Sequence, residues 1–194
     1  MYEKQKTEIE KYIKKNFSDK RRVHTYGVRD VAVHLGELYG EDIEKCEIAA
    51  LFHDMFRGVK VDSVNYYVKH LGLPTKYIDN VNLAHSKIAA IIMKRDYDIN
   101  DENIINAVSY HTTGRENMSK LEKIIYLSDA IEPMRAYPKV DEIRKLSEID
   151  LDKACLMSMT NTIDFVSEQG KYLDEDTKNA AEFLRKEIQT SNGN

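Results

Sequence analysis

Four histidines and two aspartates are the side chains of this 194-residue sequence that could act together in chemistry. Around most of them, apolar residues recur three, four or seven positions away, which is the spacing of the buried face of a helix. The six residues are His24, His53, Asp54, His85, His111 and Asp129. They fall on five predicted helices, and the ends of neighbouring helices in a bundle lie within reach of one another.

The apolar spacing is clearest around His24, at about 100° of rotation per residue. Its helical face also carries Val28, Val31, Leu35 and Leu38. His53 and His111 end similar patterns, over 46–53 and 104–111, and His85 begins one over 85–92. Asp129 follows Leu121 and Ile125, and Asp54 ends the apolar segment AALFHD.

A shared cation would account for all six residues at once. Each histidine taken alone is more simply read as a hydrogen-bonded core residue, but a buried unpaired aspartate is costly and needs a cation or several donors. Imidazole and carboxylate ligands without thiolate suit iron, manganese, cobalt or zinc, and argue against a structural cysteine-type zinc site. Ligation by His24, His53, Asp54 and Asp129 would leave positions for water and substrate, which favours metal-assisted attack on a phosphoryl group.

Other polar residues have weaker patterns. YHTTGREN places Thr112, Thr113, Gly114 and Arg115 after a helix, where they could hold phosphate, although a plain glycine-containing turn fits equally well. Arg57 and Arg135 follow the two aspartates closely enough to point at the same site. His34 and His70 are expected to be structural or exposed. The phosphate loops GxxxxGK[ST] and GxGxxG are absent, as are GxSxG and HExxH.

Three prolines and eight glycines leave long uninterrupted stretches, and these have helical rather than alternating periodicity. Gly40 suits a helix end, Ser119 with Glu122 suits a capping box, and Asn100 precedes acidic residues that suit a helix start. We expect one all-α domain over 1–194, with its motifs at about 18–135, helices at about 141–190 packed on this core, and a frayed TSNGN end. Helices are expected at about 2–16, 19–39, 43–54, 62–71, 76–82, 84–95, 101–111, 119–130, 141–148, 151–168 and 174–190.

Composition narrows the class of protein. A net charge of −4 and a pI near 5.9, without a basic stripe, disfavour a nucleic-acid partner. No apolar run suits a membrane span, and the charged N-terminus does not resemble a signal peptide. Two distant cysteines, Cys46 and Cys155, fit a reducing cytoplasm. The many amphipathic helices are compatible with a homodimer.

A helical histidine, an HD pair and a distant aspartate resemble the HD-domain metal-dependent phosphohydrolases. More narrowly, the sequence is similar to the YqeK family, the symmetrical bis(5′-nucleosyl)-tetraphosphatases of that superfamily. The resemblance runs from about 8 to 188, and YHTTGR followed by LEKIIYLSDAIEP is its most specific part. The matching segments are VHTYGV, AALFHD, AHSKIAA, YHTTGR, MSKLEKIIYLSDAIEP and NTIDF.

This resemblance implies an all-helical HD fold, a divalent metal ion and hydrolysis of diadenosine tetraphosphate to two ADP. Iron is the expected metal, with manganese, cobalt, zinc or magnesium as alternatives. By position, the metal ligands would be His24, His53, Asp54 and Asp129. Asp54, His85 and His111 would take catalytic roles, and a second ion would use His85 and His111 with Asp54 as a bridge.

The same resemblance implies which residues contact the nucleotide. Phosphate contacts would come from His24, Asp54, His85, His111, Thr112, Asp129 and Arg135. The nucleotide pocket would include Tyr172, Leu173, Asp174, Glu175, Asp176 and Thr177, although three acids at 174–176 depart from the family pattern. Tyr26 and Gly27 also depart from it, and Gly27 would permit a close approach to its helix. There are two alternatives to this function. One is hydrolysis of another HD-type substrate, such as a guanosine polyphosphate, deoxynucleotide, nucleoside monophosphate or cyclic dinucleotide, and the other is a non-catalytic nucleotide sensor.

Overall fold

The computed structural model describes residues 1–192 and contains no strand in that range. Ten α-helices and one 3-10 turn confirm the all-α fold for these residues, and the last two residues of the TSNGN end lie outside them. The elements are α1 (Glu3–Asn16), α2 (Asp19–Tyr39), α3 (Ile43–Phe52), α4 (Val61–His70), η1 (Thr75–Tyr77), α5 (Val81–Asp96), α6 (Glu102–Tyr110), α7 (Lys120–Ile131), α8 (Val140–Ser147), α9 (Leu151–Glu168) and α10 (Glu175–Asn192). None of these helices is long and apolar enough to cross a membrane.

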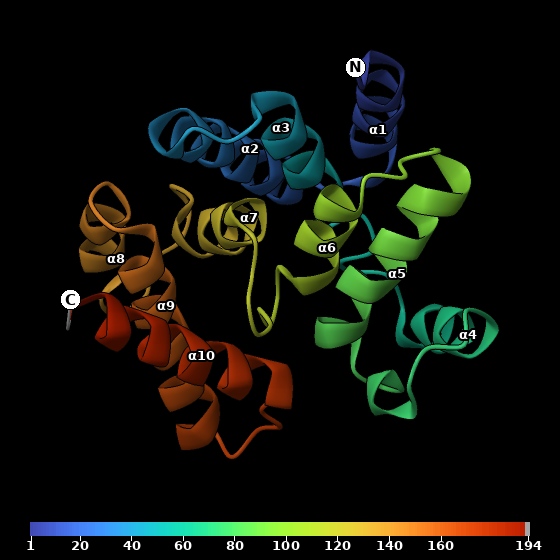
Figure 1. Ribbon diagram of the computed structural model, residues 1–194. Coiled ribbons are helices and arrows are strands. Elements are labelled where there is room, and N and C mark those ends of the chain that lie inside the picture. The colour runs from blue at the N-terminus through green and yellow to red at the C-terminus, as the bar shows by residue number, and fades with distance from the viewer. Residues whose placement is uncertain (193–194) are drawn as a thin grey trace.

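Helix α7 is the central element of the bundle. It packs against α2, α3, α6, α8 and α9, so that helices surround it on several sides (Figure 1). Its segment KLEKIIYLSDAI has apolar residues on nearly every face, and a helix of that kind must be covered all round. Helix α1 packs on α3, α4 on α5, and α10 on α9, which places these three helices in an outer layer.

Side chains cap the N-termini of six of the helices α1–α9, and a glycine ends α2. Ser119 and Glu122 form the expected capping box, and Gly40 ends α2 in the left-handed conformation with φ +65°. The start of α6 differs by one residue from the sequence expectation. Asp101 rather than Asn100 is its N-cap, because the Asp101 side chain accepts a hydrogen bond from the backbone N–H of Asn103 at 2.9 Å.

The prediction of a helix over 76–82 is wrong. The chain forms only the 3-10 turn η1 there, and Asp79 takes a left-handed conformation with φ +59° that cannot continue a helix. Helix α5 then begins at Val81, earlier than expected, because the Asn80 side chain accepts a hydrogen bond from Leu83 N–H at 3.3 Å.

Two of the helices that carry the candidate residues also end earlier than expected. Helix α3 ends at Phe52, so His53 is its C-cap and Asp54 lies in the turn that follows, where Arg57 N–H bonds back to Asp54 O at 2.9 Å. Helix α6 likewise ends just before His111. Leu38, expected on the buried face of α2, is 46% exposed in the last turn of that helix.

Glu122 anchors the loop after His111 to the start of α7. It is buried at 2% exposure, and its carboxylate accepts hydrogen bonds from Arg115 Nε at 2.5 Å, Arg115 Nη2 at 2.8 Å and Ser119 N–H at 2.8 Å. Since His111 precedes this loop and Asp129 lies further along α7, the anchor holds two of the candidate residues in register.

Replacing Glu122 by alanine should lower the free energy of unfolding by roughly 2–3 kcal/mol, because it removes both the capping box and the partner of Arg115. Urea denaturation followed by circular dichroism would measure this loss. Glu116, exposed in the same loop, is the matched control, and Glu116→Ala should stay within about 0.5 kcal/mol of the wild type. Equal effects of the two substitutions would contradict the anchoring role.

Candidate active site

His24 lies in the second turn of α2 and is held by a carboxylate from the end of α7. Its Nδ1 lies 3.0 Å from Glu132 Oε1, and Glu132 is 1% exposed. Because a carboxylate accepts, Nδ1 carries the proton and Nε2 presents a lone pair. Gly27 makes this contact possible, since a Cβ there would lie 3.1 Å from Glu132 Oε2, which explains the glycine inside α2.

Backbone carbonyls hold the other three histidines in the same tautomer. The Nδ1 atom of His53 lies 2.6 Å from Ala50 O, that of His85 lies 3.1 Å from Val81 O, and that of His111 lies 2.7 Å from Val108 O. In each case Nδ1 donates to the carbonyl, so Nε2 is left with a free lone pair. All four rings therefore offer the atom with which histidine commonly binds metals.

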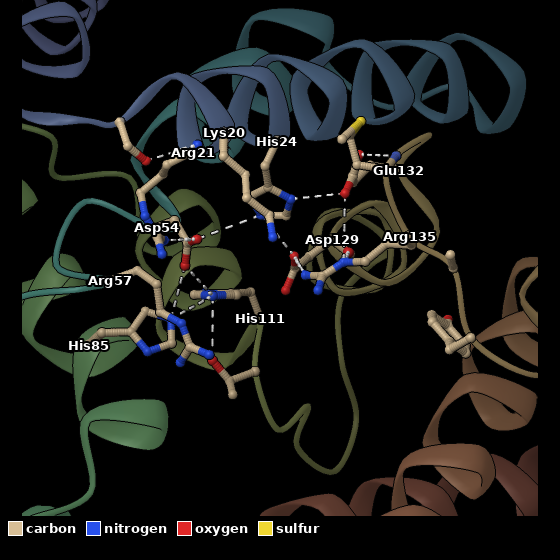
Figure 2. A pocket seen from close by; sticks show the side chains of 15 residues that line it. Lys20, Arg21, His24, Asp54, Arg57, His85, His111, Asp129, Glu132 and Arg135 are labelled. Atoms are coloured by element: carbon tan, nitrogen blue, oxygen red, sulfur yellow. Dashed lines mark hydrogen bonds and ion pairs between the residues drawn. The ribbon is translucent and has the colours of Figure 1, made fainter.

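These four Nε2 atoms converge in two pairs. Those of His24 and His53 are 3.3 Å apart, and those of His85 and His111 are 3.1 Å apart. Asp54 lies between the pairs, with Oδ2 3.6 Å from His24 Nε2 and Oδ1 3.2 Å from His85 Nε2 (Figure 2). Two lone pairs at such distances repel each other, so the arrangement fits a cation rather than a hydrogen-bonded core.

Two overlapping groups of three residues could each hold a metal ion, because the ligand atoms within each group all lie within 4.8 Å of one another. They are His24, His53 and Asp129, and His53, Asp54 and His111. Asp129 approaches the first set through Oδ1, which lies 3.2 Å from His24 Nε2. The donors are nitrogen and carboxylate oxygen only, in the combination expected for iron, manganese, cobalt or zinc. The residues present therefore fit a divalent metal ion.

Both carboxylates remain ionised, although Asp54 is buried and Asp129 is partly buried. Burial by itself would raise the pKa of Asp129, but the hydrogen bond that the protonated His24 ring donates and the charge of Arg135 hold that pKa well below its usual range. Burial likewise opposes ionisation of Asp54, but the neighbouring His53 and His85 together outweigh burial and lower the pKa of Asp54. The site thus keeps two negative charges ready for a cation.

The histidines divide into one that protonates readily and two that do not. Burial lowers the pKa of His53, and burial together with the His53 and His85 rings lowers the pKa of His111 to about 3. Burial also opposes protonation of His24, but Asp129, Glu132 and Asp54 together outweigh burial and raise the pKa of His24 above the usual value of 6.5.

Two cavities meet at this cluster. One, of about 450 Å³, opens over His24, Asp54 and His85. The other, of about 580 Å³, continues toward α9, where Tyr126 and Phe165 lie in its wall. Both cavities are lined by His111, Thr112, Asp129, Arg135 and Tyr137. A ligand larger than a mononucleotide could therefore occupy both sides of the cluster.

Most of the residues expected to contact phosphate face the first cavity. Thr112 Oγ1 lies 3.4 Å from His111 Nε2, and Arg135 forms an ion pair with the Asp129 carboxylate. The six residues of 172–177 are placed elsewhere, and none of them lines either cavity. Asp174 instead forms an ion pair with Lys76 at 3.0 Å and accepts a hydrogen bond from Asp176 N–H at the start of α10.

Sequence reasoning missed two residues of the site and misplaced a third. Glu132 escaped notice because it follows an apolar helix and no local pattern shows its contact with α2. Arg21 precedes His24 by one helical turn and forms an ion pair with Asp54 at 2.6 Å. Arg115, which the sequence suggested as a phosphate-binding residue, forms an ion pair with Glu122 instead. His34 and His70 are exposed, as expected.

Comparisons with known proteins agree with this geometry. The family model of the HD domain matches residues 21–134. Two curated relatives are named "Bis(5'-nucleosyl)-tetraphosphatase, symmetrical": one from Bacillus subtilis, 39% identical over 85% of this chain and 89% of that protein, and one from Halalkalibacterium halodurans, 36% identical over the same shares. A crystal structure of a "predicted HD superfamily hydrolase involved in NAD metabolism" from Clostridium acetobutylicum superposes with a TM-score of 0.88 at 42% identity, covering 93% of this chain and 97% of that one.

The chain belongs to the HD-domain family. Within it, the identities of 34–39% over most of the chain confirm the resemblance to the YqeK family of symmetrical bis(5′-nucleosyl)-tetraphosphatases. Membership implies dependence on a divalent metal ion, and the histidine and aspartate groups described above are able to bind one.

Glu132→Ala should weaken manganese binding by about 10- to 100-fold, because His24 would lose the acceptor that orients its ring and fixes its tautomer. Glu132→Gln, which keeps an acceptor oxygen, should have a smaller effect. Titration calorimetry on chelator-stripped protein would measure both. Glu148, which lies 3.0 Å from the exposed His34, is the matched control, and equal losses in Glu148→Ala and Glu132→Ala would contradict the assignment.

The pH dependence of metal binding should report His24. Its raised pKa means that metal-free protein holds a proton there at pH values below that pKa, and this proton must leave when a metal ion binds. Manganese affinity should therefore fall by about tenfold per pH unit below the pKa of His24 and be flat above it. His53 and His111 add no competition near neutrality because their pKa values are lowered. A constant affinity down to acidic pH would contradict this prediction.

Proposed function

We propose that this protein hydrolyses diadenosine tetraphosphate symmetrically to two ADP with a divalent metal ion bound at His24, His53, Asp54 and Asp129. The observation that carries the proposal is the convergence of four histidine Nε2 atoms and two carboxylates where two cavities meet. The names of the relatives at 34–39% identity support the choice of substrate. Iron is the metal we propose, and the nitrogen-rich donor set makes magnesium the weakest alternative.

We assign roles to the residues of this chain from their surroundings. A divalent ion bound here would supply Lewis-acid chemistry, activating water and stabilising negative charge on a phosphoryl oxygen. Asp54 and Asp129, held ionised, would act as ligands of the cation, and a carboxylate oxygen of either could orient the attacking water. Arg135 and the hydroxyl of Thr112 bind phosphate oxygens from the wall shared by the two cavities.

His85 and His111 are proposed as lone-pair donors rather than proton donors. The pKa of His111, lowered to about 3, leaves its Nε2 unprotonated at neutral pH, which is the state that binds a cation. With His85 3.1 Å away and Asp54 beside both, these three residues would hold a second divalent ion. The departing ADP is a stable anion and does not need an acid.

The C-terminal helices are proposed as part of the same HD domain. Helix α9 packs on α7 and carries α8 and α10 on its flanks. It also forms one wall of the second cavity through Asn161 and Phe165. The nucleotide contacts expected from 172–177 would require that segment to move, so we propose this wall of α9 in its place.

Product analysis tests the function directly. Protein loaded anaerobically with iron, or separately with manganese or cobalt, should convert diadenosine tetraphosphate to ADP alone. Formation of AMP and ATP would still show a hydrolase but would contradict symmetrical cleavage. Turnover of guanosine polyphosphates, deoxynucleotides or nucleoside monophosphates, without this activity, would favour another HD substrate, and binding without turnover would favour a sensor.

Asp54→Ala should abolish turnover and metal retention together, because Asp54 contacts both histidine pairs. The measurements are product formation and metal content by mass spectrometry after gel filtration. Asp30, exposed on α2 and paired with Arg29, is the matched control, and Asp30→Ala should retain both properties. A fully active Asp54→Ala protein would end the proposal.

A further inference from the structure

Three cationic side chains line the first cavity at the mouth of the cluster. Lys20 and Arg21 come from the first turn of α2, and Arg57 comes from the turn that follows α3. Figure 2 shows the three side chains directed toward the space over Asp54 and the histidines. Their elements are far apart in sequence, yet the helix start and the turn place them around the same opening.

The turn after α3 fixes Arg57 in this position. Arg57 N–H bonds to Asp54 O at 2.9 Å, and Gly58 follows with φ +83°, a conformation that favours glycine. The guanidinium reaches across the cavity mouth, where Nη1 lies 3.5 Å from Asn82 O in the first turn of α5. Arg57 therefore lies between two segments that also carry Asp54 and His85.

The charges at this mouth are unevenly balanced. Arg21 is neutralised by Asp54, and Arg135 on the shared wall is neutralised by Asp129. Within residues 1–192, neither Lys20 nor Arg57 forms an ion pair with a carboxylate. A guanidinium and a lysine that line a polar cavity and have no carboxylate as an ion-pair partner are suited to a bound anion.

We propose that Arg57 and Lys20, assisted by Arg21, bind the diphosphate of the second ADP half of the substrate. The inference rests on the proposed function and extends it to the half of the ligand that departs. Arg135 and Thr112 lie on the wall shared with the second cavity, and they serve the first ADP half. A diphosphate held on each side places the central bond of a tetraphosphate over the cluster, which accounts for symmetrical cleavage.

The test compares two substrates in the manganese-loaded protein. Diadenosine tetraphosphate carries a second diphosphate, whereas the β-(4-nitrophenyl) ester of ADP does not, and water cleaves its β-phosphorus–oxygen bond to give ADP and 4-nitrophenolate. The variant Lys20→Ala/Arg57→Ala should lose about 10- to 100-fold in kcat/KM for the tetraphosphate. Its kcat/KM for the ester should stay within about twofold, and Arg57→Lys should recover part of the loss.

The matched control is Lys94→Ala/Arg95→Ala, which removes the same two charges from exposed ion pairs at the other end of α5 and should leave both substrates unaffected. Equal losses on both substrates, or no loss on the tetraphosphate, would overturn the anion site.

A wild-type protein that left the tetraphosphate intact would overturn the proposed function instead. In that event the anion site would be decided by the binding of magnesium pyrophosphate, which must weaken at least about tenfold in the Lys20→Ala/Arg57→Ala protein. An unchanged pyrophosphate affinity would overturn the anion site as well.

Discussion

The structure depends on one constraint: four imidazole rings and two carboxylates must face one another inside a helical bundle. Within each histidine pair the Nε2 atoms are 3.3 or 3.1 Å apart, a distance at which two lone pairs repel. A polar centre of this kind is costly to bury unless a cation compensates it. The surrounding residues accordingly either fix the ring orientations or bring positive charge to the carboxylates, as Arg21 and Arg135 do.

The four rings are fixed in two ways. His53 and His111 lie at helix C-termini, where the last carbonyls lack intrahelical partners and can accept from Nδ1, and His85 bonds to Val81 O inside α5. His24 lies within α2, and its ring is held by a carboxylate from another element. Glu132 supplies it, and the close approach requires glycine at position 27. One long-range contact thus explains both a buried acid and a helical glycine.

The parts of this molecule that could be predicted from sequence are those with local causes. Periodicity and capping residues gave the helices, and the apolar faces around His24, His85 and Asp129 marked side chains that do converge. The ends of α3 and α6 could not be predicted, because a turn that begins inside an apolar segment does not change the spacing of its apolar residues. Glu132 and Arg21 were missed for another reason: their roles arise from contacts 108 and 33 residues away along the chain. The nucleotide contacts of 172–177 were predicted from the resemblance alone, and in the structure Asp174 forms an ion pair with Lys76.

The placement of arginines beside the two aspartates of the cluster relates the fold to the proposed chemistry. Each aspartate is matched by one arginine, which compensates its negative charge. A divalent cation would add the same charge that the two arginines now contribute, and those arginines would then be free to bind phosphate. The cation and the two guanidinium groups would then together favour an anionic substrate at this centre.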